Sequence, residues 1–397
     1  MHHTLRSNSI SVLGLALLGL AGIFLISYAH FEPQPRVKIT VFIHGTVGGP
    51  LNFLSSSQCS QEFDPECATA RAVRYVRNHE LMHYDNILGA EGLHEFVKDE
   101  LPLWHAARHL IPAYDDLAQT VECERKKRHY YTFGWSGYLH HGARRAAAYE
   151  LYNSLCDRRD EIRTRYGVDP EVELIGYSHG GNVGLWLASA EDFYKRGLTV
   201  NTLVMLAAPM QKEMAQAIES PLFTTIVLLS SQGDGIQTRD YFSNKEGRSY
   251  ARMADIADIK KITSENKNMR RHDLWCALND DLYGVTHINM WLAGRSGILF
   301  EWMDPLPFFM AVPMVLRALE GCPATTEAVC ALCDCNNGCV VTIDGTACSA
   351  ETARELREKL TAWALQMREQ WRLADDTSRN VTFNRKNWNL LKRFIWG

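Results

Sequence analysis

The sequence lacks an excess of positive charge. Its 42 lysine and arginine residues stand against 46 aspartate and glutamate residues, which gives a formal net charge of −4 at pH 7. No segment carries a sustained stripe of Lys and Arg, which is the electrostatic footprint of nucleic-acid binding. We therefore expect no nucleic-acid partner. The composition, with 46% hydrophobic and 22% charged residues, is that of an ordinary globular protein.

Charge is also missing from a long stretch near the N-terminus. Residues 10–29 are uncharged and mostly apolar, and a helix of that length can span a hydrocarbon core of about 30 Å. The stretch also fits the apolar region of a signal peptide, with Ser27 and Ala29 spaced as at a cleavage site. A buried core helix is disfavoured because no polar face interrupts the run. Residues 1–29 are therefore predicted to be a signal peptide or an N-terminal membrane anchor of an exported protein, secreted or membrane-anchored.

Strand and helix patterns alternate over residues 36–300. Near-continuous apolar strands are typical of a parallel sheet whose two faces are both covered. Amphipathic stretches between them, at 147–162 and 181–195, predict helices. The expected fold class is therefore α/β, a doubly wound, mostly parallel sheet, with an insertion at 48–128. The strands are predicted at 37–43, 129–133, 172–176, 201–207 and 224–229.

The spacing typical of zinc sites is missing from the eleven cysteines. Only one CxxC pair occurs near the C-terminus, and no histidine lies in the cysteine cluster. Together with the N-terminal segment, this favours a small disulfide-stapled subdomain at 301–350 over a metal site, followed by a C-terminal helix and tail at 351–397. The clustered cysteines are Cys322, Cys330, Cys333, Cys335, Cys339 and Cys348, with Cys59 and Cys67 as another close pair; because the total is odd, Cys123, Cys156 and Cys276 are candidates for a thiol outside these bonds.

A serine lies in a sharp turn between a predicted strand and a predicted helix. Gly176-Tyr177-Ser178-His179-Gly180 fits the pattern G-x-S-x-G. In that context the serine hydroxyl is held clear of the sheet, and the following helix N-terminus favours developing negative charge. Ser178 is therefore the candidate nucleophile. The alternative is an ordinary turn that happens to contain a serine.

A serine hydroxyl needs a base, and the base needs an orienting carboxylate. Asp234 follows the strand predicted at 224–229, where functional groups gather in open α/β sheets. His287 lies in a later loop, and the chain order Ser, Asp, His is that of hydrolases. Structural roles, a turn aspartate and a helix-capping histidine, are the alternatives. The substitutes considered are His272 for the base and Asp240, Asp255 and Asp258 for the acid.

An acyl-transfer site also needs donors for the oxyanion of its tetrahedral intermediate. The backbone N–H groups of Thr46, after the first strand, and of His179, after the candidate nucleophile, are placed to supply them. His44 is interpreted as structural. Ser136 also follows a strand, but no glycine precedes it at the required spacing, so we expect only a loop that borders the pocket.

These motifs together resemble α/β-hydrolase-fold lipases and esterases. The resemblance rests on Val41-Phe42-Ile43-His44-Gly45-Thr46, on the G-x-S-x-G run with Gly181-Asn182, on Gly233-Asp234 and on Thr286-His287-Ile288-Asn289, and it covers roughly 37–294. It implies catalytic roles for Ser178, Asp234 and His287 and oxyanion-hole roles for Thr46 and His179. The long insertion and the cysteine-rich part depart from the minimal fold.

The predicted function is hydrolysis of carboxylic esters by a serine nucleophile, without a metal or organic cofactor. A thioesterase, an acyltransferase or a peptidase would use the same residues. A binding protein on a retired hydrolase fold, displayed at a membrane, is the alternative outside enzymes. The expected partner is an ester or lipid substrate, with membrane association through the N-terminal segment, and the oligomeric state is left open. Aromatic residues that favour a lipid, but that also suit a plain core, are Trp104, Phe300, Trp302, Phe308 and Phe309.

Overall fold

A computed structural model describes the chain over 35–47, 64–83, 86–102, 105–122, 126–237, 248–278, 281–283, 285–292, 307–332, 341–343 and 346–347. The predicted segments at 1–29 and 351–397 lie outside these residues. Within them, none of the helices has the length and apolar character needed to cross a bilayer.

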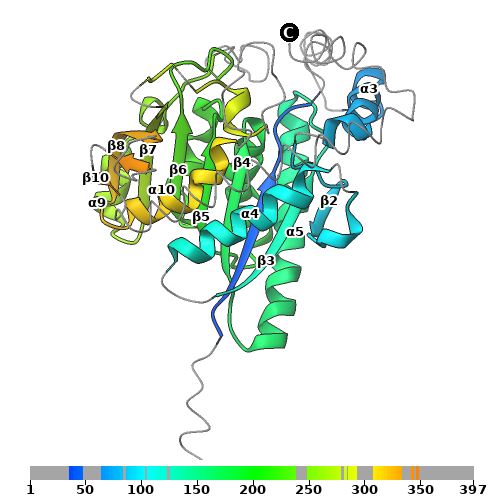
Figure 1. Cartoon of the computed structure of the whole chain (residues 1–397), viewed down its shortest axis with the longest axis horizontal. Helices are drawn as coiled ribbons and strands as arrows, with labels where there is room; N and C mark the ends of the chain where they lie inside the picture. The colour runs from blue at the N-terminus through cyan, green and yellow to red at the C-terminus, as the bar shows by residue number, and fades with distance from the viewer. Residues whose placement is uncertain are drawn as a thin grey trace, which may run out of the picture.

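A ten-stranded sheet forms the centre of the molecule, in the order β10-β9-β8-β7-β6-β5-β4-β1-β3-β2 (Figure 1). The strands from β8 to β3 all run parallel, whereas β2, β9 and β10 add antiparallel edges. The mostly parallel sheet expected from the sequence is therefore confirmed. The strands are β1 (Val37–Ile43), β2 (Gly92–Glu95), β3 (Lys127–Gly134), β4 (Glu171–Tyr177), β5 (Val200–Leu206), β6 (Phe223–Ser230), β7 (Arg270–Leu278), β8 (Thr325–Leu332), β9 (Val341–Ile343) and β10 (Thr346–Ala347).

Helices cover both faces of the sheet, and each face has its own hydrophobic core. One core packs α4 (Ala106–Val121) and α10 (Val312–Leu319) against the sheet, and the other packs α5 (His141–Tyr166) and α7 (Leu187–Tyr194) against the opposite face. This arrangement explains why the central strands read as near-continuous apolar runs. The other α-helices of the described residues are α3 (Ala68–Arg77), α6 (His179–Leu185), α8 (Ala215–Glu219) and α9 (Ile259–Glu265), and the short 3-10 turns include η4 (Met253–Asp255), η5 (Ile288–Met290) and η6 (Phe308–Ala311).

The predicted helix at 181–195 is two helices in the structure. Helix α6 ends at Leu185 and α7 begins at Leu187, with Trp186 between them. The strands β7 and β8 were not predicted, because charged residues such as Arg270, Arg271 and Asp273 interrupt the apolar pattern of β7. The insertion at 48–128 contains α3, β2 and the long helix α4.

The structure does not support a separate cysteine-rich subdomain at 301–350. Strand β8 pairs in parallel with β7, with Cys330 opposite Cys276, and β9 and β10 extend the same sheet. Cys322 carries a free thiol, as do the buried Cys156 and Cys276. The apolar face of α10 joins the core with α4, so the described parts of the segment belong to the main fold. The predicted pairing partners Cys59, Cys333, Cys335, Cys339 and Cys348 lie outside the described residues, as does Cys123.

Candidate active site

Three polar side chains meet at the carboxyl edge of the parallel strands. Ser178 directly follows β4, Asp234 lies in the loop after β6, and His287 lies in the segment after β7. Because parallel strands end at the same edge of a sheet, residues far apart in the sequence come together there.

The backbone at Ser178 is held in a conformation that side chains rarely adopt. Its φ of 50° and ψ of −127° mark a strained turn between β4 and α6, at a typical cost of about 1–3 kcal/mol. Glycine is required on both sides of it. A Cβ on Gly176 would lie 2.6 Å from the Cα of Gly181, and one on Gly180 would lie 2.4 Å from the carbonyl oxygen of His44. The glycines of the motif therefore let α6 approach the sheet closely enough to form the turn.

A directed chain of hydrogen bonds joins the three side chains. His287 Nε2 lies 3.1 Å from Ser178 Oγ, and His287 Nδ1 lies 2.7 Å from Asp234 Oδ2. The other carboxylate oxygen of Asp234 accepts the N–H groups of Ile236 and Gln237, each at 3.0 Å. Since Asp234 fixes the proton on Nδ1, Nε2 is left to accept the serine proton. Ser178 and His287 retain 6% and 7% of their surface, so the hydroxyl is partly enclosed and is not sealed off.

An aromatic stack supports His287 from behind. The Tyr177 hydroxyl donates to the His287 carbonyl oxygen at 3.1 Å, and the two rings lie 5.0 Å apart. Trp291 stacks on Tyr177 at 5.6 Å, and its indole N–H donates to Asn86 at 2.6 Å. The insertion thus reaches the site through Asn86. No sequence pattern indicated a role for these residues, although Tyr177 lies within the G-x-S-x-G run.

The loop after β1 lies against the candidate nucleophile. A Cβ added to Gly45 would lie 2.9 Å from Ser178 Cβ. Within the described part of the chain, the Thr46 N–H makes no hydrogen bond, and the buried Thr46 hydroxyl has no partner either. His179 is the first residue of α6, and its ring lies 3.1 Å from the amide nitrogen of Asn182. The loop that carries Thr46 therefore contacts Ser178 through Gly45, and His179 follows Ser178 directly in the chain.

The substitute residues lie elsewhere. His272 is buried inside β7 opposite Val227, and burial lowers its pKa to about 4. Asp255 pairs with Arg252, and Asp258 caps α9 by accepting the Lys261 N–H. The Ser136 hydroxyl accepts the N–H of Tyr138 at 3.3 Å and is a loop residue, as expected. Asp240 lies outside the described residues.

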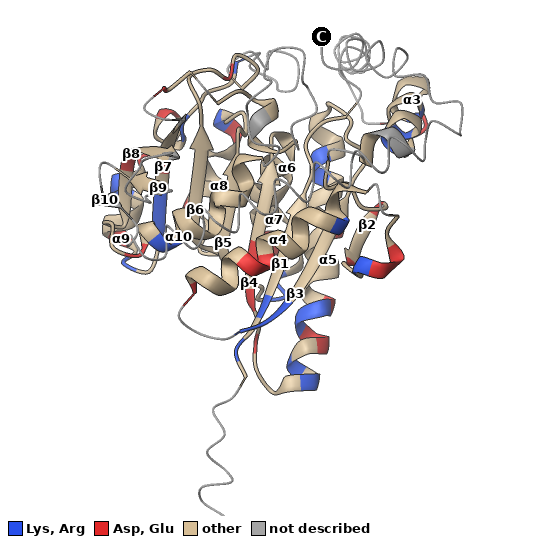
Figure 2. Ribbon diagram, in the orientation of Figure 1, with Lys and Arg blue, Asp and Glu red and all other residues tan. Residues whose placement is uncertain are grey.

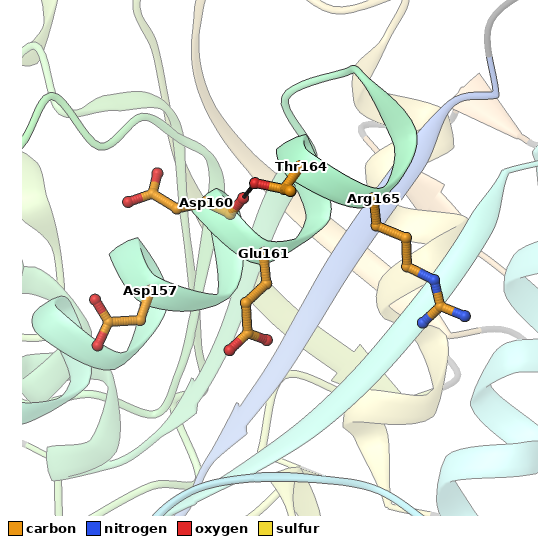
Figure 3. Close-up of a pocket in the computed structure, with 5 residues that line it drawn as sticks. All are labelled: Asp157, Asp160, Glu161, Thr164 and Arg165. Carbon is orange, nitrogen blue, oxygen red and sulfur yellow. Dashed lines mark hydrogen bonds between the residues drawn. The ribbon is translucent and has the colours of Figure 1, made fainter.

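A surface depression lies on the C-terminal half of α5 (Figure 3). The half of α5 that lines it leads into β4, so it faces the amino ends of the strands rather than the end that carries Ser178. The Thr164 hydroxyl already donates to the Asp160 carbonyl at 2.8 Å. The depression is thus unrelated to the candidate active site. Its lining residues are Asp157, Asp160, Glu161, Thr164 and Arg165.

Among the described residues, no three His, Cys, Asp or Glu side chains gather closely enough to hold an ion. The hydrogen-bonded chain itself is built from a hydroxyl, an imidazole and a carboxylate, which can move a proton without a metal.

No protein-family model matches the chain, and no curated protein matches its sequence. Among solved structures, an esterase from Pyrobaculum calidifontis is 13% identical over 85% of this chain and 78% of its own, with a TM-score of 0.25. A structure from a study of two Rhizomucor miehei esterases is 11% identical over 87% and 78%, with a TM-score of 0.26. An arylesterase is 13% identical over 80% and 96%, with a TM-score of 0.28. Similarities this low give no evidence about function. Any functional argument must therefore rest on the strand order and the hydrogen-bonded side chains of this chain.

Proposed function

We propose that this chain is a serine hydrolase of the α/β-hydrolase type that cleaves carboxylic esters. The observation that supports this most strongly is the hydrogen-bonded chain from Ser178 Oγ through His287 to Asp234, on a strained turn at the carboxyl edge of a parallel sheet. A scaffold that only binds has no need for a backbone held at positive φ beneath an aligned imidazole. The enzyme is therefore favoured over the retired fold.

In the acylation half, His287 Nε2 takes the proton of Ser178 as Oγ attacks the ester carbonyl carbon. The carbonyl π electrons move to oxygen, where the N–H groups of Thr46 and His179 stabilise the negative charge. Asp234 stabilises the imidazolium that forms. When the carbonyl re-forms, the alcohol oxygen leaves and takes its proton from His287.

In the second half, water hydrolyses the acyl-enzyme. His287 accepts a proton from water as the oxygen attacks the acyl carbon, and Ser178 leaves with the proton returned from the imidazolium. The products are a carboxylic acid and the free enzyme. Thioesters and amides also have a carbonyl carbon that Ser178 could attack. These residues alone therefore do not determine which leaving group the enzyme accepts.

Exposed apolar side chains near Asp234 favour an apolar acyl group. Ile236, two residues beyond the carboxylate, is 48% exposed, and Tyr283 is 66% exposed. The Tyr283 carbonyl lies against Gly233, which places both residues beside the same loop. The aromatic residues named from the sequence give less support. Phe308 and Phe309 lie in the core with α4, and Trp104, Phe300 and Trp302 lie outside the described residues.

Hydrolysis of p-nitrophenyl esters of graded acyl length tests the proposal. We expect Ser178→Ala to remove activity down to the background rate, a loss of at least about a thousandfold. Ser136→Ala is the matched control, because it removes a hydroxyl that also follows a strand at this edge, and it should keep most of the activity. Equal rates for wild type and Ser178→Ala would contradict the proposal.

We also propose that residues 1–29 direct export, as a cleaved signal or a retained anchor. The support is the uncharged apolar run at 10–29. N-terminal sequencing of the mature protein tests it. A start near residue 30 indicates cleavage, an intact N-terminus in the membrane fraction indicates an anchor, and an intact N-terminus in the cytosol would contradict export.

A further inference from the structure

The loop that carries Thr46 is held on both sides by the segment after β3. The Trp135 indole N–H donates to the His44 carbonyl at 2.8 Å, and the Trp135 backbone N–H donates to His44 Nε2 at 3.2 Å. Beyond Thr46, the Val47 N–H donates to the Gly137 carbonyl at 3.1 Å. The two residues that flank Gly45-Thr46 are therefore fixed by the run that contains Ser136.

A buried arginine from the insertion reaches the same histidine. Arg77, at the end of α3, is 1% exposed, and its Nε lies 3.4 Å from His44 Nε2. Its other nitrogens donate to Asn78 Oδ1 at 2.7 Å and to the Gly89 carbonyl at 2.5 Å. Burial lowers the Arg77 pKa to about 10, which still leaves the guanidinium charged at neutral pH. Burying such a charge is costly, so its position beside His44 calls for an explanation.

These contacts determine which ring nitrogen of His44 carries the proton. Nε2 faces the N–H groups of both Trp135 and Arg77, so it must act as an acceptor and carry no proton. Burial, and then the positive charge of Arg77, lower the pKa of His44 well below its usual value, so the ring is neutral. Its single proton is therefore on Nδ1, which lies 2.7 Å from the Gly45 carbonyl oxygen and donates to it.

The hydrogen bond to Gly45 orients the next peptide N–H. In a trans peptide the C=O and N–H groups point in opposite directions, and the described chain contains no cis peptide bond. Because the Gly45 carbonyl is held toward the His44 ring, the Thr46 N–H of the same peptide plane points away from that ring. This loop lies directly against Ser178, and the Thr46 N–H makes no hydrogen bond within the described residues.

We infer that Arg77 and Trp135 are positioning residues for the oxyanion hole. They hold His44 with its proton on Nδ1, His44 fixes the Gly45 carbonyl, and the Gly45–Thr46 peptide then presents the Thr46 N–H to the oxyanion. This inference rests on the proposed function, since it assigns a purpose to that N–H. It also gives the insertion a role in catalysis without placing any of its residues on the substrate.

Paired variants test this relay. In the wild-type protein the rings of His44 and Trp135 stack with their centroids 5.7 Å apart. Trp135→Phe keeps an aromatic ring at this position but removes the indole N–H. Arg77→Gln removes the guanidinium. We expect each to lower kcat for ester hydrolysis by about tenfold to a hundredfold and to change KM by less than about threefold, because the lost stabilisation belongs to the transition state. Affinity for a boronic acid, which forms a tetrahedral adduct with a serine, should fall in parallel.

The matched control is Arg74→Gln on the same helix. Arg74 pairs with Glu66 and Glu91 near the surface and does not contact His44. Its kcat and boronic-acid affinity should equal those of wild type, which separates the relay from a general loosening of α3. Thermal unfolding of every variant verifies that the measured protein is folded.

The histidine tautomer gives a readout that a purely structural role would not move. In ¹⁵N-histidine NMR spectra we expect wild-type His44 to be protonated on Nδ1 alone, and Arg77→Gln to show exchange with the Nε2 form. A wild-type His44 protonated on Nε2 would overturn the inference, even if neither variant folded. So would folded variants with unchanged kcat and boronic-acid affinity. If Ser178→Ala still abolishes activity in that case, only the relay fails; if Ser178→Ala stays active, the proposed function fails.

Discussion

The two edges of the parallel sheet use polar side chains differently. At the amino ends of β1, β3 and β4, oppositely charged residues gather, whereas the carboxyl ends hold few charges (Figure 2). Lys38 lies 2.9 Å from Glu173 and 3.1 Å from Glu122, and Glu173 also accepts the hydroxyls of Thr40 and Tyr114 at 3.2 Å each. Burial alone would lower the Lys38 pKa, but the two carboxylates outweigh it and raise that pKa.

At the amino edge every named charge has a partner of opposite sign, and the backbone around it is regular. At the carboxyl edge the hydrogen bonds run in one direction, from the Ser178 hydroxyl on its strained turn to His287, and from His287 to the Asp234 carboxylate. The Thr46 N–H beside it makes no hydrogen bond within the described residues. A closed network stabilises a fold, whereas the directed chain at the carboxyl edge is the arrangement that the proposed ester hydrolysis requires.

The largest effect is expected from a substitution at the carboxyl ends of the strands. Asp234→Asn should lower kcat about a thousandfold to ten-thousandfold, because the amide no longer fixes the proton on His287 Nδ1 or stabilises the imidazolium. Stopped-flow or steady-state ester hydrolysis measures it. Asp255→Asn is the matched control, since Asp255 only pairs with Arg252 at the surface. Comparable activity in the two variants would contradict the role assigned to Asp234.

A substitution in the charged network at the amino ends of the strands should lower the free energy of unfolding without changing kcat. Glu173→Gln removes the nearest carboxylate of Lys38 but leaves Glu122 at 3.1 Å, so the free energy of unfolding should fall by about 1–3 kcal/mol. Urea denaturation measures this loss, and kcat of the folded variant should stay at the wild-type value. Glu171→Gln at the same edge removes the more exposed pair with Lys126 and should cost less than about 1 kcal/mol. A large drop in kcat for folded Glu173→Gln would contradict the claim that the charged network at the amino ends affects stability alone.

A buried carboxylate within β7, between the two ends of the strands, should make the stability of the fold depend on pH. Burial raises the pKa of Asp273 to about 6 from 3.8, although the N–H groups of Met253 and Ala254 bond to it at 3.0 and 2.9 Å. Between pH 4 and pH 6 the folded protein binds more protons at this site than the unfolded chain, so stability falls as pH rises through that window. The full contribution is about 3 kcal/mol.

The comparison of wild type with Asp273→Asn isolates this contribution. Wild type should lose about 2.4 kcal/mol of unfolding free energy relative to the variant between pH 4 and pH 7, as measured by urea denaturation at both values. Parallel stability profiles for the two proteins would show that Asp273 does not titrate with a raised pKa.

The sequence predicted the strands whose apolar character reflects burial on both faces. Strands β1, β3, β4, β5 and β6 lie within about two residues of their predicted bounds. The strained turn was predictable as well, because its glycines are required by close contacts with neighbouring backbone. These features depend on short segments, so local patterns suffice.

Features set by distant contacts could not be predicted. Strand β7 carries Arg271, whose guanidinium is buried and donates to the carbonyls of Ile218 and Phe223. Because a charged residue interrupts the apolar pattern, the sequence did not predict this central strand. The cysteine spacing at 301–350 favoured a separate unit because it could not indicate that β8 would pair with β7. Arg77 resembled any helix-surface arginine until the fold placed it against His44.

Covalent labelling with a fluorophosphonate, followed by peptide mass spectrometry, tests the central claim most directly. We expect one adduct, on the peptide that contains Ser178 and at that residue, formed much more slowly in Asp234→Asn and absent in Ser178→Ala. An adduct on another residue, or ester hydrolysis that persists while Ser178 remains unlabelled, would contradict it.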